Sequence, residues 1–204
     1  MEMNLLPLSF WVKSGIWAIL LHVSGALAVD YIAWKGGFAY QVMAGQFLLL
    51  AGGVWLLIVL IVLLLRMRRF GHIDPLRIIL WVVGVAVLSA PLKAAGEWLM
   101  EPLLIEAYEA YPDRRAAALK DYLRRQQVEP QRIEEIVQMQ LTLYAEYRQK
   151  SRDLLWLIGS RIKVLGLLGG IYGFILGLLL RGGGTVGSPV KALRGGSGGN
   201  AVSS

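Results

Sequence analysis

Four long runs of apolar residues, separated by polar segments, dominate this chain. They cover about residues 11–34, 40–65, 76–95 and 156–180. A helix needs about 20 mostly apolar residues to cross the hydrocarbon core of a bilayer, and each run reaches that length. The second run holds no charged residue from Tyr40 to Leu65. Because backbone groups in lipid must bond internally, the pattern predicts an all-α membrane protein with four transmembrane helices.

The polar segment between the third and fourth runs, about residues 96–155, has a pattern of its own. Pro112 and Pro130 each suit the first turn of a helix, where a missing N–H leaves no hydrogen bond unmade. Apolar residues recur after both prolines at helical spacing. They are Leu119, Tyr122 and Leu123 after the first, and Ile133, Ile136, Val137, Leu141, Tyr144 and Tyr147 after the second.

We therefore expect an amphipathic helical insert between the third and fourth membrane helices. In one interpretation the insert is a helical hairpin that folds its apolar stripe onto itself or onto the bundle. In the other, the stripe is a docking surface for a partner helix or subunit. Acidic and basic residues nearly balance in the insert, unlike a basic helix that lies on anionic lipid.

Composition agrees with a single membrane domain over residues 1–181, followed by a flexible Gly/Ser-rich tail over residues 182–204. Of 204 residues, 56% are hydrophobic and 17% are charged. The absence of cysteine excludes disulfides and thiolate metal sites. The net charge of +7 comes largely from Arg66, Arg68, Arg69 and Arg77 between the second and third runs, and from the tail. No aromatic and basic platform accompanies these charges, so we expect no nucleic-acid partner.

The basic residues also predict an orientation. Basic connections stay in the cytoplasm, so residues 66–77 and the tail should lie there. The protein is then a multi-pass protein of the inner (plasma) membrane with cytoplasmic N- and C-termini, and the insert lies outside. Arg161 and Lys163 oppose this assignment, although long side chains can extend to the interface.

In an alternative interpretation, the first run is a cleaved signal peptide ending near Ala28.

Glycines form a face on the fourth run. Gly169, Gly173 and Gly177 recur every four residues, and Gly166 and Gly170 form a second pair. Such faces let two helix backbones approach closely in lipid. The first run has a matching stripe of mostly small residues, so we expect it to pack against the fourth. That stripe comprises Gly15, Ala18, His22, Gly25, Ala26 and Val29.

Four polar residues are predicted within or at the ends of the spans: His22, Asp30, Lys93 and Glu97. Ionisable groups inside a membrane are costly and are candidates for function, here a proton or ion relay. In the structural interpretation, His22 bonds a backbone carbonyl or Ser24 of a neighbour, and the other three are solvated near the surface. We favour the structural interpretation.

The residues needed for common catalytic sites are missing. With only two histidines, His22 and His72, the chain lacks the paired histidines of a membrane metalloprotease. No G-x-S-x-G elbow is present, and Gly182–Gly184 are not followed by the Lys and Ser or Thr of a P-loop. We therefore expect no enzyme activity, no cofactor and no bound metal.

The order of elements resembles a bacterial family of unknown function, best represented in Bacteroidota-type bacteria. The features that carry the resemblance are the segment 128–136 (VEPQRIEEI), the glycine-rich fourth run and the basic connection after the second. The resemblance covers about Val12 to Arg181 and implies four membrane helices with a charged helical insert between the third and fourth. The chain departs from it in its Gly/Ser tail and Arg-rich insert. It implies no activity and no catalytic residue.

Two functions are consistent with these patterns. The first is a non-catalytic accessory, assembly or scaffold subunit of a larger membrane complex, which would contact the lipid bilayer and a membrane-protein partner. The alternative is a small transporter, or an ion- or proton-conducting homo-oligomer, that uses His22 and Asp30.

Overall fold

The computed structural model describes residues 7–69 and 74–181, so the predicted tail over residues 182–204 lies outside the described residues. Within these ranges the chain is 91% helical and contains no strand. Four helices are long and apolar enough to cross a membrane: α1 (Leu8–Lys35), α2 (Ala44–Arg68), α3 (Pro75–Met100) and α7 (Leu154–Arg181). They coincide with the four predicted runs.

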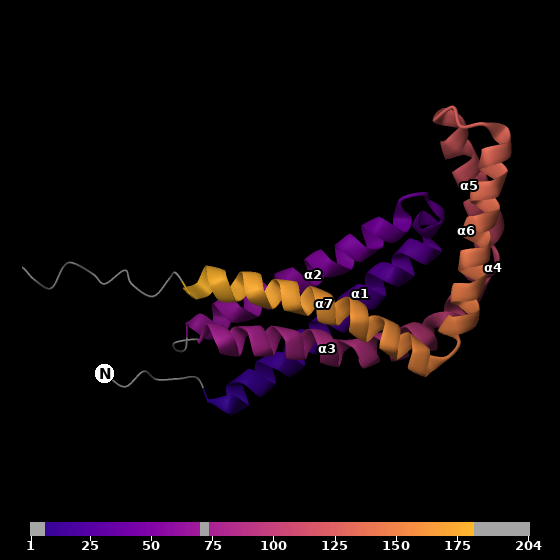
Figure 1. Cartoon of the computed structure of the whole chain (residues 1–204). Coiled ribbons are helices and arrows are strands. Elements are labelled where there is room, and N and C mark those ends of the chain that lie inside the picture. The colour runs from indigo at the N-terminus through magenta and orange to yellow at the C-terminus, as the bar shows by residue number, and fades with distance from the viewer. Residues whose placement is uncertain (1–6, 70–73, 182–204) are drawn as a thin grey trace, which may run out of the picture.

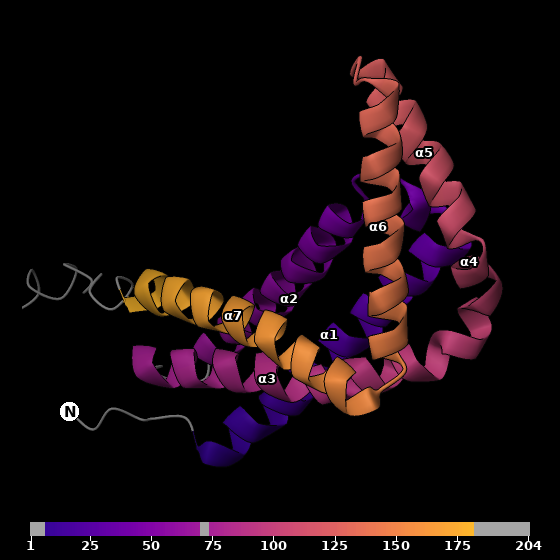
Figure 2. The ribbon, with the colours of Figure 1, turned by 45° about the vertical axis from the view of Figure 1, so that its right-hand side comes forward.

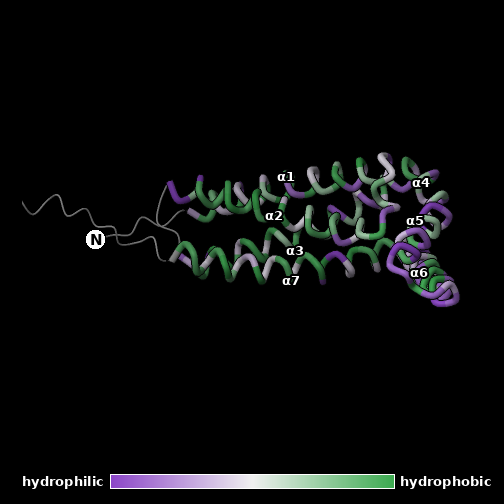
Figure 3. Tube along the Cα trace, turned by 90° about the horizontal axis from the view of Figure 1, so that it is seen from above, coloured by the Kyte–Doolittle hydropathy of each residue, from purple (hydrophilic) through white to green (hydrophobic). Residues whose placement is uncertain are grey.

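The four spans lie side by side and alternate in direction along the chain (Figure 1). The hydropathy view shows them mainly hydrophobic, with polar residues gathered near their ends and in the insert (Figure 3). The most extensive contact joins α3 to α7, and α1 packs against both α3 and α2. By contrast, α2 has little contact with α7. The bundle is therefore built on α3 and α7, with α2 held mainly by α1.

Local sequence sets several helix ends. Asp74 caps α3, since its Oδ1 accepts a hydrogen bond from the Leu76 N–H at 3.0 Å, and Pro75 occupies the first turn. Gly37 adopts a positive φ of 76°, which residues other than glycine rarely adopt. There the chain turns from α1 through a short 3-10 helix (Phe38–Tyr40) into α2.

Several of the largest fully buried side chains lie toward the end of the bundle where α2 ends and α3 begins. Leu56, Leu60, Leu64, Ile78 and Val82 are each at most 1% exposed and belong to one apolar cluster. Lipid chains are as apolar as these side chains, so close van der Waals packing holds such a cluster together in a membrane.

The insert forms four elements: a 3-10 helix (Glu101–Leu104), α4 (Ile105–Glu109), α5 (Tyr111–Arg125) and α6 (Pro130–Ser151). Helices α5 and α6, called the arm below, stand across one end of the bundle (Figures 1 and 2). Pro112 and Pro130 lie in the first turns of α5 and α6, as predicted. The first two elements were not predicted.

The arm has a small core of its own. Leu119 of α5 is buried against Ile133 and Val137 of α6, and Val42 from the connection between α1 and α2 packs against this cluster. The hairpin interpretation of the insert is thus confirmed for most of the stripe, which folds onto itself and onto the end of the bundle, whereas Tyr122 and Tyr147 remain 42% and 40% exposed.

Candidate functional site

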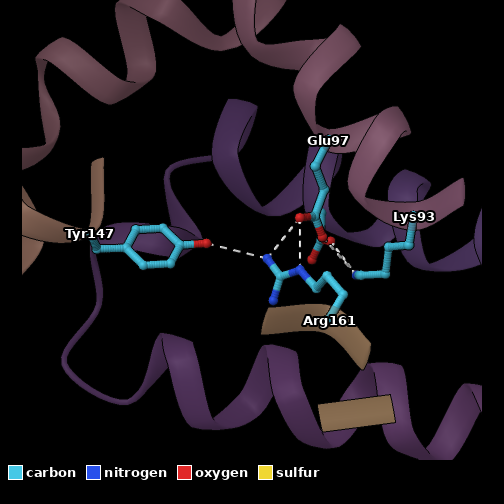
Figure 4. A network of polar contacts seen from close by, with 5 residues as sticks. Lys93, Glu97, Tyr147 and Arg161 are labelled. Atoms are coloured by element: carbon cyan, nitrogen blue, oxygen red, sulfur yellow. Dashed lines mark hydrogen bonds and ion pairs between the residues drawn. The ribbon is translucent and has the colours of Figure 1, made fainter. Parts of the chain in front are cut away.

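Four charged side chains from three spans meet at the end of the bundle that carries the arm. Lys93 Nζ lies 2.8 Å from Asp30 Oδ2 and 3.2 Å from Glu97 Oε1. Arg161 donates from Nε to Glu97 Oε2 at 2.8 Å, and its Nη2 lies 2.7 Å from the same oxygen. Tyr147 of α6 accepts a further hydrogen bond from Arg161 at 3.3 Å (Figure 4).

This arrangement corrects the expectation that Asp30, Lys93 and Glu97 are solvated. Their side chains are only 14–24% exposed, and each is neutralised by a partner of opposite charge. Helical spacing brings Lys93 and Glu97 together because they lie one turn apart on α3. Such mutual pairing is what lets charges remain at a poorly solvated position.

Next to these charges, α6 is fixed to the two short elements that follow α3 and to α5. Arg148 of α6 pairs with Glu101 at 2.7 Å and stacks its guanidinium 4.2 Å from the ring centre of Tyr108. The Tyr144 hydroxyl donates to the Tyr108 carbonyl at 3.2 Å, and its ring stacks on Tyr111 at 4.1 Å. Burial raises the pKa of Tyr144 to about 12, although the nearby Arg148 opposes this shift. The arm is thus held by charge pairs and by stacked rings.

A further anchor binds the start of α5. Arg115 donates hydrogen bonds to the carbonyl groups of Gln41 and Val42 in the connection between α1 and α2. The arm is therefore held at the connections of the bundle as well as at its charged residues.

His22 lies in the middle of α1 and is only 1% exposed. Neither of its ring nitrogens has a hydrogen-bond partner among the described residues. The expected backbone-carbonyl partner is absent among the described residues, and Ser24 of the same chain donates to the Leu20 carbonyl at 2.8 Å. A bond to Ser24 of a neighbour stays a prediction. Buried polar groups without partners are rare, so this one needs an explanation.

A cavity of about 450 Å³ connects these features. We call it the lateral cavity, because α2 and α7, which scarcely touch, form two of its walls. Its lining includes His22, Asp30, Lys93, Glu97, Gly52 and Arg161. The candidate residues His22, Asp30, Lys93 and Glu97 therefore border one space. Its volume falls within the range of small-molecule sites.

The glycine face of α7 lies against α3. A Cβ added at Gly169 would lie 2.6 Å from Ala86 Cβ, and one at Gly173 would lie 3.3 Å from Ile79 Cα. Gly177 also faces Ile79, whereas Gly166 has only a 3.8 Å neighbour and Gly170 has none within 4 Å. The expected neighbour was the first span. The structure instead places the third span there.

Large side chains of α2 and α3, and not the helix α7, pack against the small residues of α1. Gly15 lies beside Trp81 of α3, and Gly25 lies against the ring of Trp55 of α2. Trp55 donates from its indole N–H to the Leu21 carbonyl at 3.0 Å. A stripe of small residues can thus accommodate a tryptophan as well as another close-packed backbone, and the sequence pattern does not distinguish these cases.

Sequence reasoning missed the roles of Arg161 and Tyr147. It noted Arg161 only as a basic residue at the end of a span. The available signal was Glu97 near the same end of a neighbouring span, since two opposite charges at one depth favour pairing. No group of three or more His, Asp or Glu residues in the described ranges could hold a metal ion.

Comparison with known proteins adds no relative. No protein-family model, curated protein or solved structure gives a significant match to the chain. The resemblance to a bacterial four-helix family therefore stays a prediction.

Proposed function

We propose that this protein is a non-catalytic accessory or assembly subunit of a larger membrane complex, and that the arm is its docking element. The observation that carries the proposal is a charged helix outside the spans that exposes large apolar side chains. Met139 and Leu143 of α6 are 54% and 53% exposed and lie four residues apart, on one side of the helix.

The charge of the arm supports a protein partner. Glu135 and Glu146, together with Lys150, are exposed on the same helix, so the apolar pair is set among charges of both signs. Protein interfaces combine such an apolar centre with a polar rim. We expect a partner surface with a complementary apolar patch and little net charge.

The fixation of the arm supports the same proposal. Tyr147 connects α6 to Arg161 of α7. Arg148 and Tyr144 connect α6 to the two short elements that follow α3, and Arg115 connects α5 to the connection between α1 and α2. A docking surface that is already ordered loses less conformational entropy on binding. A rigid arm is therefore well suited to present a binding surface at a defined position relative to the membrane.

The test is a native mass measurement on protein extracted from its own membranes. We expect the intact protein to carry unrelated subunits, and the Leu143→Glu variant to lose them. Gln149→Glu introduces the same charge at another exposed position of α6 and should retain them. A mass equal to copies of this chain alone, in every variant, would contradict the proposal.

We also propose the inner-membrane location with cytoplasmic termini, which rests on the basic connection and the basic tail. A cysteine introduced at Gln126 of the arm should then react with a membrane-impermeant reagent in cells whose inner membrane is intact. Labelling only after that membrane is permeabilised would show that the arm lies in the cytoplasm and would contradict the proposed orientation.

A second candidate function is transport or proton conduction, and the lateral cavity favours it. The cavity runs from the charged residues to His22. Beyond His22, the buried apolar cluster that includes Leu56, Leu60 and Val82 fills the bundle. Conduction would therefore require a rearrangement of these helices. Proton uptake by vesicles containing only this protein would support this candidate over the first.

A further inference from the structure

We infer that the lateral cavity binds one zwitterionic glycerophospholipid of the surrounding bilayer. Its headgroup lies against Lys93, Glu97 and Arg161, and its ester carbonyls lie deeper, toward His22. The inference rests on the cavity alone and does not depend on the proposed docking role of the arm.

The charges that line the cavity favour an occupant without net charge. Lys93, Arg148 and Arg161 are balanced by Asp30, Glu97 and Glu101, all within the lining. An anionic headgroup would add an uncompensated charge to this poorly solvated space. A zwitterionic headgroup adds no net charge. Its phosphate can accept from free N–H groups of Lys93 and Arg161, while its ammonium group faces the carboxylates.

His22 supplies the second, independent observation. It is almost fully buried and borders the cavity, and neither ring nitrogen has a partner within residues 7–69 and 74–181. Asp30 lies eight residues further along α1, or about 12 Å along the helix axis. In a glycerophospholipid the ester carbonyls lie between headgroup and acyl chains. A headgroup at the charged end thus places acceptors on the side of His22, where an imidazole N–H can donate.

The two other possible occupants satisfy the site less well. A transmembrane helix of another chain bonds its backbone groups internally, so an apolar one would leave His22 unpartnered and cover the charges with hydrocarbon. Water alone would satisfy His22 but would also have to fill the part of the cavity lined by Leu48, Leu49 and Leu168.

The wall formed by α2 provides a route of entry from the bilayer. Gly45 and Gly52 border the cavity, and a Cβ added at either would meet no atom within 4 Å. Leu49 on the same wall is 57% exposed. Because α2 and α7 scarcely touch, an acyl chain can lie between them without displacing packed side chains.

The test fills the cavity without disturbing the fold. Gly52→Leu adds a side chain to the cavity wall, and Gly170→Leu is the matched control. Gly170 also has no neighbour within 4 Å, but it lies outside the lining. Delipidated protein is mixed with phosphatidylethanolamine, phosphatidylcholine or phosphatidylglycerol of identical chains, and bound lipid is counted by native mass spectrometry.

We expect one phosphatidylethanolamine or phosphatidylcholine per chain in the parent protein and in Gly170→Leu. Its affinity should fall about tenfold or more in Gly52→Leu, a factor that corresponds to about 1.4 kcal/mol. His22→Leu should lower the affinity as well, whereas His22→Gln, whose amide still donates, should restore it.

Three results would overturn the inference. The first is equal lipid binding by Gly52→Leu and Gly170→Leu. The second is a preference for phosphatidylglycerol, which would indicate an anion site. The third is no retained lipid in the parent protein, which would leave water or a partner helix as the occupant.

Discussion

Gly169→Ala is the smallest change that tests the close packing of α3 and α7. The added Cβ would lie 2.6 Å from Ala86 Cβ and 3.4 Å from Val83 Cα, whereas carbon atoms in contact normally lie about 3.5–4.0 Å apart. Neither carbon can rotate away, because both are attached directly to a helix backbone. The two helices must therefore separate locally by about 1 Å, the shortfall from that normal contact distance.

Overpacking of this kind typically costs about 1–3 kcal/mol. Alanine in place of glycine also favours the helix by up to about 1 kcal/mol, and this gain partly hides the cost. Gly170→Ala, one position along the same helix, carries the same gain without a contact, since no atom lies within 4 Å of its Cβ. The difference between the two variants therefore isolates the clash.

The assay is reversible denaturation of both variants in the same detergent micelles, followed by helical circular dichroism. We expect Gly170→Ala to match or exceed the parent protein, and Gly169→Ala to unfold about 1–3 kcal/mol more easily than Gly170→Ala. Equal unfolding free energies for the two variants would refute the close approach of α3 and α7 at this glycine.

Three further predictions concern the charged residues, the arm and His22. Arg161→Gln should lower the unfolding free energy by about 3 kcal/mol, because it leaves Glu97 partly unpaired. The control Lys163→Gln, at an exposed site, should change the unfolding free energy by less than about 0.5 kcal/mol. Equal losses in the two variants would contradict the pairing of Arg161 with Glu97. Because burial raises the pKa of Tyr144 from 10.0 to about 12, its contribution to stability should be complete below pH 10 and lost as the pH rises toward 12. Thermal unfolding of Tyr144→Phe against pH should show a smaller decline, because only Tyr108, whose pKa burial also raises to about 12, still contributes from the arm's contacts. A decline identical to that of the parent protein would count against this account of Tyr144. His22→Gln should keep the helix content and add or remove no proton flux in vesicles, whereas a flux that disappears with the histidine would indicate a relay.

The hydropathy pattern was enough to predict the four long apolar helices and the helices α5 and α6 of the insert. Uncharged runs of about 20 residues leave few alternatives to membrane helices, and α2 accordingly spans Ala44–Arg68. In the insert, Pro112 and Pro130 indicated where helices begin, and the stripe that includes Ile133 and Val137 indicated their inner face. These signals are local, so they can be read from neighbouring residues.

The pairing of helices could not be predicted in the same way. Glycines on α7 indicate a close neighbour but not which one, and both α1 and α3 carry small residues. The shape of the side chains decides which helix packs against α7. Trp55 and Trp81 fill the small-residue stripe of α1, so α7 packs against α3. The meeting of Asp30, Lys93 and Arg161 likewise depends on three helices that are distant in sequence.

The docking role of the arm is tested most directly by photo-crosslinking in native membranes. A photoreactive amino acid replaces Leu143, and in a separate variant it replaces Gln149 on the same helix. We expect a discrete crosslinked product with an unrelated protein from position 143 and none from position 149. Crosslinks from position 143 only to lipid or to a second copy of this chain would contradict it.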